Sequence, residues 1–340
     1  MNRKLLIAIA FCLAASLSFS QDLHSIADII HIIDTSKLVY SIGIDTTPIS
    51  ENCPDYSANT LDHFYYQEVK NSSKTVGEYK LSYEAEIVFG LAESAFMHEN
   101  YDSALYYYNK VATMQPGFSP AITYAGQVYE KKHNDQAAIA QYKKAIGANY
   151  FDYMAHWFLA DAYDAIGNNK DAVSEITIAS ILNRDNPRLK EALQRIYKAA
   201  YSVYRDWCFV PQYQLSKMDN GDLSVKFAEP WMSYALVKAV WKYQPGYRES
   251  MGGKLGDYSL TEDREALYAM AAYLYADSSQ KWKSCRSLVG LDMAVKKKMF
   301  NEYLLYEVIL PKYPKIVFAF DRESIDQIKD YVMYAHTHDQ

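Results

Sequence analysis

The chain has 340 residues, half of them apolar and 22% charged, a composition that excludes extended disorder and allows one large or two ordinary folded units. The formal net charge of −6 makes nucleic acid and anionic membrane surfaces poor partners. Tyrosine is unusually abundant, with 32 residues, and its large apolar ring and polar hydroxyl suit helix crossings near a surface.

The first 20 residues have the layout of a cleavable secretory signal. Arg3 and Lys4 precede an apolar run over residues 5–17, and the small residues Ser18 and Ser20 precede Gln21. The run is too short to span a membrane as a helix, and we expect no membrane span later in the chain. We therefore expect cleavage after Ser20 and an exported protein, either periplasmic or secreted.

The cysteines argue against a lipid anchor. Cys12 lies within the signal, but Phe11 stands where a lipoprotein signal has a small residue.

Removal of residues 1–20 takes away two basic and no acidic residues, which moves the net charge from −6 to −8. Cys53, Cys208 and Cys285 remain, and their wide spacing matches no metal signature. We expect buried apolar cysteines, with one disulfide bond as the alternative.

Residues 21–82 form a leading region before the helical repeats. Residues 25–42 predict an amphipathic helix that can finish as a strand, because Ile26, Ile29, Ile30 and Ile33 fall on one side of a helix. Residues 45–57 are rich in turn formers and predict a loop. We expect the helix to cap the first repeat.

Three units offset by 34 residues follow. Small or apolar residues coincide at this offset: Ala104, Ala138 and Ala172; Leu91, Ala125 and Leu159; and Ala92, Gly126 and Ala160. A fixed period of this length is typical of stacked helical hairpins. The turns inside the units read ENYDS, HNDQA and GNNKD, and their Asn and Asp residues tolerate left-handed backbone and cap the helix that follows.

This pattern resembles the tetratricopeptide repeat (TPR) family, which places a small residue on the first helix and an alanine where the second helix crosses it. The resemblance implies a mainly α fold: an α-solenoid of about three hairpins over residues 83–187, with a capping helix over 188–207. It also implies a scaffold for protein or peptide binding. The signal ending SFSQ and residues 229–249 are similar to exported, uncharacterised TPR proteins of Bacteroidota.

In the TPR family the first helix of each hairpin lines the concave face. That register places seven residues of this chain on a partner-binding groove: Phe89, Glu93, Thr123, Gln127, Trp157, Asp161 and Asp164. Family members that hold a peptide carboxylate present Lys, Arg and Asn there, whereas this groove is aromatic and acidic. We therefore expect a protein or peptide partner with apolar anchors and basic residues. The alternative for Phe89 and Trp157 is packing between repeats.

Residues 208–340 predict a mostly helical α+β domain. Alternating residues around 213–215 and 223–227 flank the turn formers of 219–222, which is typical of an antiparallel hairpin. We expect helices at about 230–244, 261–276, 291–310 and 322–336. Glycines in 251–258 lack the flanking strand and Lys-Ser/Thr of a phosphate loop, so this stretch is interpreted as a connector.

The sequence contains no pattern typical of a catalytic or metal site. His336 and His338 near the end are expected to be solvated. We expect no cofactor and a non-enzymatic scaffold in the cell envelope. One alternative is a hydrolase or carbohydrate-handling protein with a site near Trp241–Tyr258; another is an architectural protein whose repeats stack on their own copies.

Overall fold

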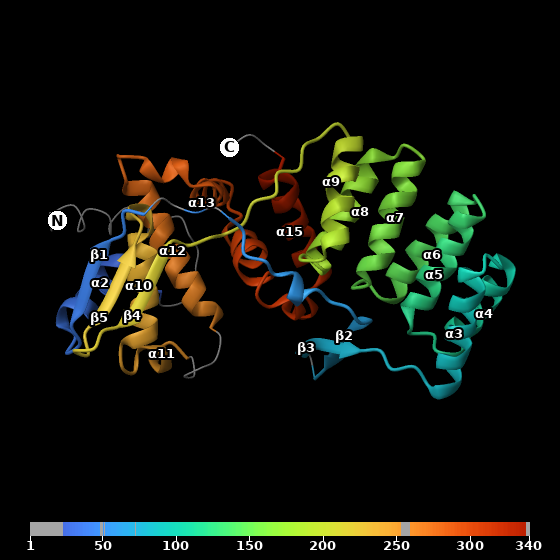
Figure 1. Ribbon diagram of the computed structural model, residues 1–340, viewed down its shortest axis with the longest axis horizontal. Helices are drawn as coiled ribbons and strands as arrows, with labels where there is room; N and C mark the ends of the chain where they lie inside the picture. The colour runs from blue at the N-terminus through green and yellow to red at the C-terminus, as the bar shows by residue number, and fades with distance from the viewer. Residues whose placement is uncertain (1–22, 48–49, 51, 72, 253–258, 338–340) are drawn as a thin grey trace. The chain divides into compact units, whose positions relative to one another are not determined.

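The computed structural model describes residues 23–47, 50, 52–71, 73–252 and 259–337 (Figure 1). The predicted signal, the glycine-rich stretch 253–258 and His338 lie outside the described residues. The described residues divide into two compact units, each made from separate stretches of sequence: those within 23–54 and 207–308 form one, and those within 55–206 and 309–337 form the other. Of the helices in the described part, none has the length and apolar character needed to cross a membrane.

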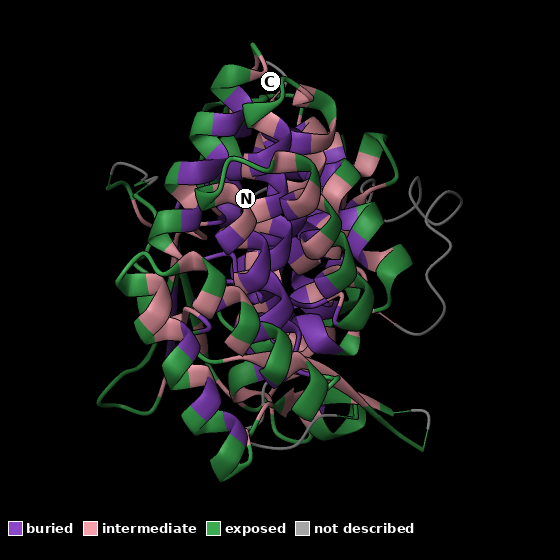
Figure 2. Ribbon diagram, turned by 90° about the vertical axis from the view of Figure 1, so that its right-hand side faces the viewer, coloured by how far each residue is buried: buried purple, intermediate pink, exposed green. Residues whose placement is uncertain are grey.

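The second unit contains the helical repeats. Its three hairpins are α3 and α4, α5 and α6, and α7 and α8, and α9 follows them; their bounds are Tyr83–Met97, Tyr101–Met114, Ser119–Lys131, Asp135–Ala148, Tyr153–Ala165, Asn169–Leu182 and Pro187–Ala199. Each helix packs on the next one along the chain. Buried residues lie on the inner faces of these helices (Figure 2). The predicted TPR-like α-solenoid is therefore confirmed.

Small residues allow the helices of each hairpin to cross closely. Ala104, Ala138 and Ala172 are fully buried at the predicted crossing positions. Gly126 faces the ring of Tyr142, and a Cβ atom added there would lie 2.4 Å from Cε1 of that ring. A glycine is therefore required at this crossing unless the ring moves.

In the repeat turns, one residue adopts the left-handed conformation and a different residue takes the N-cap position of the next helix. Glu99, His133 and Gly167, each 34 residues apart, adopt positive φ angles of 57°, 56° and 75°. Asn100 and Asn134 come next and cap the following helices, because their side chains accept hydrogen bonds from backbone N–H groups. These two asparagines thus cap as predicted, whereas Asn168 in the third turn makes no side-chain capping bond. In all three turns the residue before the asparagine takes the left-handed conformation.

A β-hairpin and the C-terminal helix complete the repeat unit. Strands β2 (Tyr65–Lys70) and β3 (Ser73–Glu78) pair in antiparallel fashion. The 3-10 helix η5 (Pro314–Ala319) packs on this hairpin, and α15 (Arg322–Ala335) packs on α8. The hairpin was not predicted, and the last helix belongs with the repeats instead of a separate domain over 208–340.

His336 is buried, contrary to the prediction of a solvated tail. Its ring is stacked on Tyr204 with centroids 4.9 Å apart, and Nδ1 lies 2.7 Å from the carbonyl oxygen of Arg205. The chain leaving α9 therefore packs on the end of α15 and gives the histidine a polar partner inside the unit.

The other unit combines a small sheet with helices. Its strands β1 (Tyr40–Ile44), β4 (Tyr213–Lys217) and β5 (Leu223–Phe227) are ordered β1-β5-β4, with β5 antiparallel to β4 and parallel to β1. The predicted β4–β5 hairpin and the helix-then-strand pattern of 25–42 are confirmed. The helix α2 (Ile26–Thr35), however, packs on α10 (Met232–Tyr243) in this unit and does not cap the repeats.

Of the remaining helices of this unit, the one expected over 261–276 is confirmed as α12 (Leu260–Ala276), whereas the one expected over 291–310 is broken. The others are α11 (Tyr247–Ser250), α13 (Arg286–Lys296) and α14 (Phe300–Tyr303). The single helix expected over 291–310 is interrupted at Lys298, whose φ of 61° is incompatible with a continuous helix.

Two of the three cysteines form a disulfide bond, which corrects the expectation of buried thiols. Cys53 and Cys208 are joined with Cα atoms 5.7 Å apart, across 155 residues of sequence. Cys285 is not part of this bond and is buried, as was expected for all three. The disulfide bond joins the leading region to the residues just before β4, within one unit.

Candidate functional site

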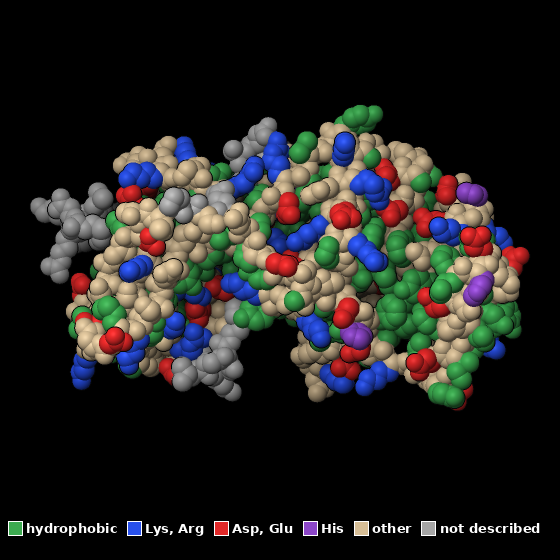
Figure 3. All heavy atoms as spheres, viewed as in Figure 1, with side chains coloured by type: hydrophobic (Ala, Val, Ile, Leu, Met, Phe, Trp, Pro, Cys, Tyr) green, Lys and Arg blue, Asp and Glu red, His purple; other side chains and the backbone are tan. Residues whose placement is uncertain are grey.

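The first helices of the hairpins carry aromatic side chains that are only partly buried. Phe89 on α3 lies 5.9 Å from Tyr124 and 5.5 Å from Phe118, measured between ring centroids. Trp157 on α7 lies 5.7 Å from Phe158. Figure 3 shows apolar side chains gathered in a hollow over α5 and α7, with acidic side chains at its margin. We call this surface the groove.

Thr123 was predicted to face the groove but is fully buried. Its hydroxyl donates to Oδ2 of Asp152 at 3.0 Å, and the hydroxyl of Ser119 donates to the same oxygen at 2.8 Å. Asp152 also caps α7 by accepting from the N–H of Ala155 at 3.1 Å. Burial raises the pKa of the Asp152 carboxyl, and these donors oppose the rise. Thr123 therefore joins two repeats and is not accessible to a partner, whereas Gln127 stays partly exposed.

Two of the predicted acidic residues share one arginine. Arg195 on α9 donates through Nη1 to Asp164 Oδ2 at 3.1 Å and through Nη2 to Asp161. Burial raises the pKa of Asp161, and the Arg195 guanidinium opposes that rise. Sequence reasoning missed Arg195, although one further step of 34 residues from Asp161 reaches it.

Two further acids on the first helices, Glu93 on α3 and Glu130 on α5, accept hydrogen bonds from buried tyrosines. The hydroxyl of Tyr108 donates to Glu93, and that of Tyr142 donates to Glu130 at 2.6 Å. Burial raises the pKa of Glu130, and the Tyr142 hydroxyl opposes this effect. These carboxylates are thus held in fixed positions by the repeat core.

A segment of the chain itself lies across the beginnings of the first helices. Asn183 contacts both backbone groups of Leu61: its Oδ1 accepts from the N–H at 2.9 Å, and its Nδ2 donates to the carbonyl at 3.0 Å. Asn149 donates to the carbonyl of Tyr65 at 2.8 Å. Asn149 and Asn183 are 34 residues apart and end α6 and α8 in the same way. Residues 60–65 are therefore held through their backbone by equivalent positions of two repeats, and we call them the inner strap.

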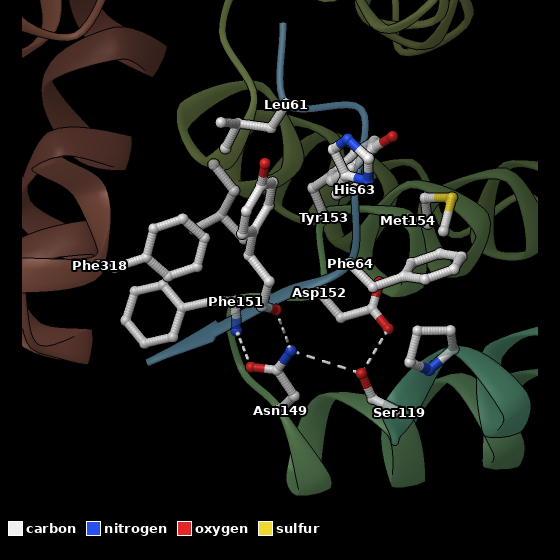
Figure 4. Close-up of a pocket in the computed structure, with 13 residues that line it drawn as sticks. Leu61, His63, Phe64, Ser119, Asn149, Phe151, Asp152, Tyr153, Met154 and Phe318 are labelled. Carbon is white, nitrogen blue, oxygen red and sulfur yellow. Dashed lines mark hydrogen bonds between the residues drawn. The ribbon is translucent and has the colours of Figure 1, made fainter. Parts of the chain in front are cut away.

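Phe64 anchors the inner strap among aromatic rings. Its ring makes edge-to-face contacts with Phe118 and Tyr124, at centroid distances of 5.5 and 6.3 Å, and also with Phe89 at 6.5 Å. Figure 4 shows Leu61 and Phe64 beside the hydrogen-bonded Asn149, Ser119 and Asp152. The remaining cavity, about 10 Å³, is at most the size of one water molecule. The inner strap thus fills this end of the repeats.

The other unit contains a buried polar cluster near the alternative catalytic site. Glu265 is fully buried, and it accepts from Trp241 Nε1 at 2.5 Å and from the Tyr247 hydroxyl at 2.9 Å. The N–H of His24 also donates to it, at 2.8 Å. These groups satisfy one another and tie His24, just before α2, to α12. With an exposed fraction of 2%, Trp241 cannot stack on a sugar.

Ion pairs next to this cluster are also internal. Lys238 lies between Glu262 and Asp263, and its Nζ is 3.0 Å from Asp263 Oδ1. Arg248 Nη2 lies 2.5 Å from Glu262 Oε2. Within the described residues, no group of three or more His, Cys, Asp or Glu side chains is placed to hold a metal ion.

Comparison with known proteins finds solved TPR structures that are similar to part of this chain. No family model and no curated protein matches the sequence. Similar solved structures include the TPR domain of Arabidopsis OM64 (17% identity, covering 34% of this chain and 94% of that one, TM-score 0.32) and TPR2B of yeast Sti1 in a complex with pHsp70 (20%, 35%, 98% and 0.33). A third is the Yersinia enterocolitica type III secretion chaperone SycD with a peptide of the translocator YopD (17%, 36%, 92% and 0.33).

Proposed function

We propose that this chain is a non-enzymatic scaffold that binds a segment of a partner protein in the groove, through apolar anchors with basic residues beside them. The observation that carries the proposal is the inner strap. An extended segment with one aromatic anchor, Phe64, already packs on the repeats through asparagine contacts to its backbone. Along α7, Tyr153 beside the inner strap is followed one turn later by Trp157, and both are partly buried aromatic residues.

The charge of the groove favours a basic partner. Four carboxylates, those of Glu93, Glu130, Asp161 and Asp164, lie on the first helices, and the Arg195 guanidinium pairs with two of them. Because each carboxylate is already held by a donor of this chain, a partner cation would meet a fixed negative field and would not have to order the acids. Such complementarity mainly raises the association rate and makes it sensitive to salt.

We further propose that the protein is exported. The signal-like residues 1–20 support this, and so does the Cys53–Cys208 disulfide bond, since such bonds persist in oxidising compartments and are rare in the cytosol. Mass spectrometry of the mature protein should find Gln21 at the N-terminus and no lipid. Peptide mapping without reductant should recover the Cys53–Cys208 pair, and free thiols at both positions in the envelope fraction would contradict export.

The groove can be tested with a selected peptide. Displayed peptide libraries would be selected on the mature chain, and the affinity of the best peptide measured for the parent and for Trp157→Ala at low and high salt. We expect at least about tenfold weaker binding, because burial of an aromatic anchor is worth more than 1 kcal/mol. Lys144→Ala, an exposed change on α6, is the matched control.

A charge variant tests the basic part of the preference. Asp161→Asn combined with Asp164→Asn should slow association and flatten its salt dependence, while leaving Arg195 in place. If both variants bind like the parent with folding intact, recognition does not use the groove.

A further inference from the structure

The outer face of α3 is an exposed apolar stripe. Tyr83, Ile87 and Leu91 follow one another at intervals of four residues, so they lie on one side of the helix. Their exposed fractions are 74%, 49% and 46%. Among the helices in the described part of the chain, α3 packs extensively on α4 alone. We call these three residues the α3 stripe.

The repeat register shows what this face is built to contact. Ile87 corresponds to Ala121 and Ala155 at the 34-residue offset, and both alanines are fully buried. Ala121 packs with Val111 of the preceding α4, and Ala155 packs with Ala145 of the preceding α6. In α5 and α7 the equivalent face is therefore covered by the second helix of the preceding hairpin.

Residues equivalent to Leu91 repeat the pattern. Ala125 packs in a cluster with Ala104 and Tyr108 of α4, and Leu159 packs in a cluster with Tyr142 of α6. Both are 1% exposed. α4 packs on α5 through apolar residues at i, i+4 and i+7, namely Ala104, Tyr108 and Val111. A helix with the same spacing would thus pack on the α3 stripe.

The two ends of the repeat stack differ: the outer face of α9 is polar, as in a terminal capping helix, whereas that of α3 is apolar. Terminal repeats of solenoids carry polar outer faces, which keep them soluble. The last helix, α9, obeys this rule with exposed Arg188, Glu191, Gln194 and Lys198. At the other end, Ile87 and Leu91 are exposed, and they are larger than three of the four buried residues at the equivalent positions, which are alanines. An uncovered apolar face of this kind marks an interaction site.

We propose that the α3 stripe docks an amphipathic helix of a partner protein, packed as the missing second helix of a preceding hairpin and bearing Lys or Arg beside its apolar residues. The charge of α3 selects this occupant. The helix carries Glu84 and Glu86 beside the stripe and no basic residue, so a second copy of the same face would add like charge while a basic helix would complement it.

The chain supplies a defined probe. A synthetic peptide of residues 134–149 copies α6, which covers α7 through Ala138, Tyr142 and Ala145 and carries Lys143 and Lys144. Because isolated helices of this length are marginal in water, the peptide would be stapled across its outward positions 136 and 140. Fluorescence anisotropy with the mature chain would then measure its affinity.

We expect saturable binding that weakens at least about tenfold in the double variant Ile87→Asp with Leu91→Asp, since each change removes a buried aliphatic contact from the complex. Tyr275→Asp, at a residue of α12 that is 74% exposed, should leave binding unchanged. Trp157→Ala should also leave it unchanged, which separates this surface from the groove. Thermal melts should show that the exposed substitutions do not unfold the chain.

Three outcomes would overturn the proposal. One is no binding at about 1 mM peptide, an affinity too weak for a docking site. Another is binding that the double variant does not change. The third is sedimentation of the parent as a dimer that the double variant dissociates, which would make the α3 stripe an interface between copies of this chain.

Discussion

Replacement of Asn183 by alanine should release the inner strap. Asn183 is 1% exposed and pairs with both backbone groups of Leu61, which is itself 4% exposed. In the variant, a buried N–H and a buried carbonyl would lose their partner. Each such group costs about 1–3 kcal/mol if it stays buried.

The inner strap can avoid the cost of these unpaired groups by detaching from the repeats, which returns them to water. If residues 60–65 detach instead, the loss is mainly the burial of Leu61, worth about 1.5–3 kcal/mol, and part of the Phe64 contacts. The free energy of opening the inner strap should therefore fall by about 2–3 kcal/mol. At about 1.4 kcal/mol for each factor of ten, this corresponds to at least about 30-fold faster amide exchange.

Hydrogen exchange measured by mass spectrometry is the appropriate assay, because the chain has two units and need not unfold in one step. Protection over residues 60–66 should drop, while protection of α10 in the other unit should not. Asn109→Ala, an exposed change on α4, is the matched control and should alter neither. Unchanged protection at Leu61 in Asn183→Ala would refute the backbone clamp.

Three further predictions concern stability. Gly126→Ala should lower the free energy of unfolding by about 1–3 kcal/mol, because its Cβ would overlap the ring of Tyr142. Gly147→Ala, in open space on α6, should instead raise it by up to about 1 kcal/mol. Equal effects of the two variants in urea unfolding would contradict the close crossing. Burial raises the pKa of Glu130 in the folded state, so its contribution to stability is complete below the unfolded pKa and is lost as the pH rises through the folded pKa. Glu130→Gln, which keeps an acceptor for Tyr142, should therefore gain stability over the parent between about pH 4 and pH 7, and a constant difference across that range would count against the shift. Reduction of the disulfide bond, which spans 155 residues, should lower the midpoint of thermal unfolding, since such a crosslink removes up to about 5 kcal/mol of unfolded-chain entropy; an unchanged midpoint would show that the bond contributes little.

The repeat architecture could be predicted because its signals are local and recur. Each hairpin buries alanines at fixed positions, such as Ala104 and Ala138, and a period of 34 residues makes these positions visible without any knowledge of distant contacts. The β4–β5 hairpin was predictable for the same reason, since its two strands are neighbours in the sequence and flank a recognisable turn.

The candidate site was predicted only in part. The offset put Phe89 and Trp157 on the first helices, where they are partly exposed, but it also put Thr123 there. Thr123 is instead buried, and its hydroxyl donates a hydrogen bond to Asp152, 29 residues later. A register assigns a face of a helix; which side chains on that face meet the next repeat depends on their individual partners.

Contacts between distant segments were decided by the tertiary structure alone. The inner strap depends on Leu61 and Asn183, which are 122 residues apart, and β1 pairs with β5 across a still larger separation. The pairing of Cys53 with Cys208 likewise needed the positions of both segments. Sequence periodicity reports which residues of one element are buried together, whereas a long-range contact requires the packed arrangement of whole elements, which no local pattern encodes.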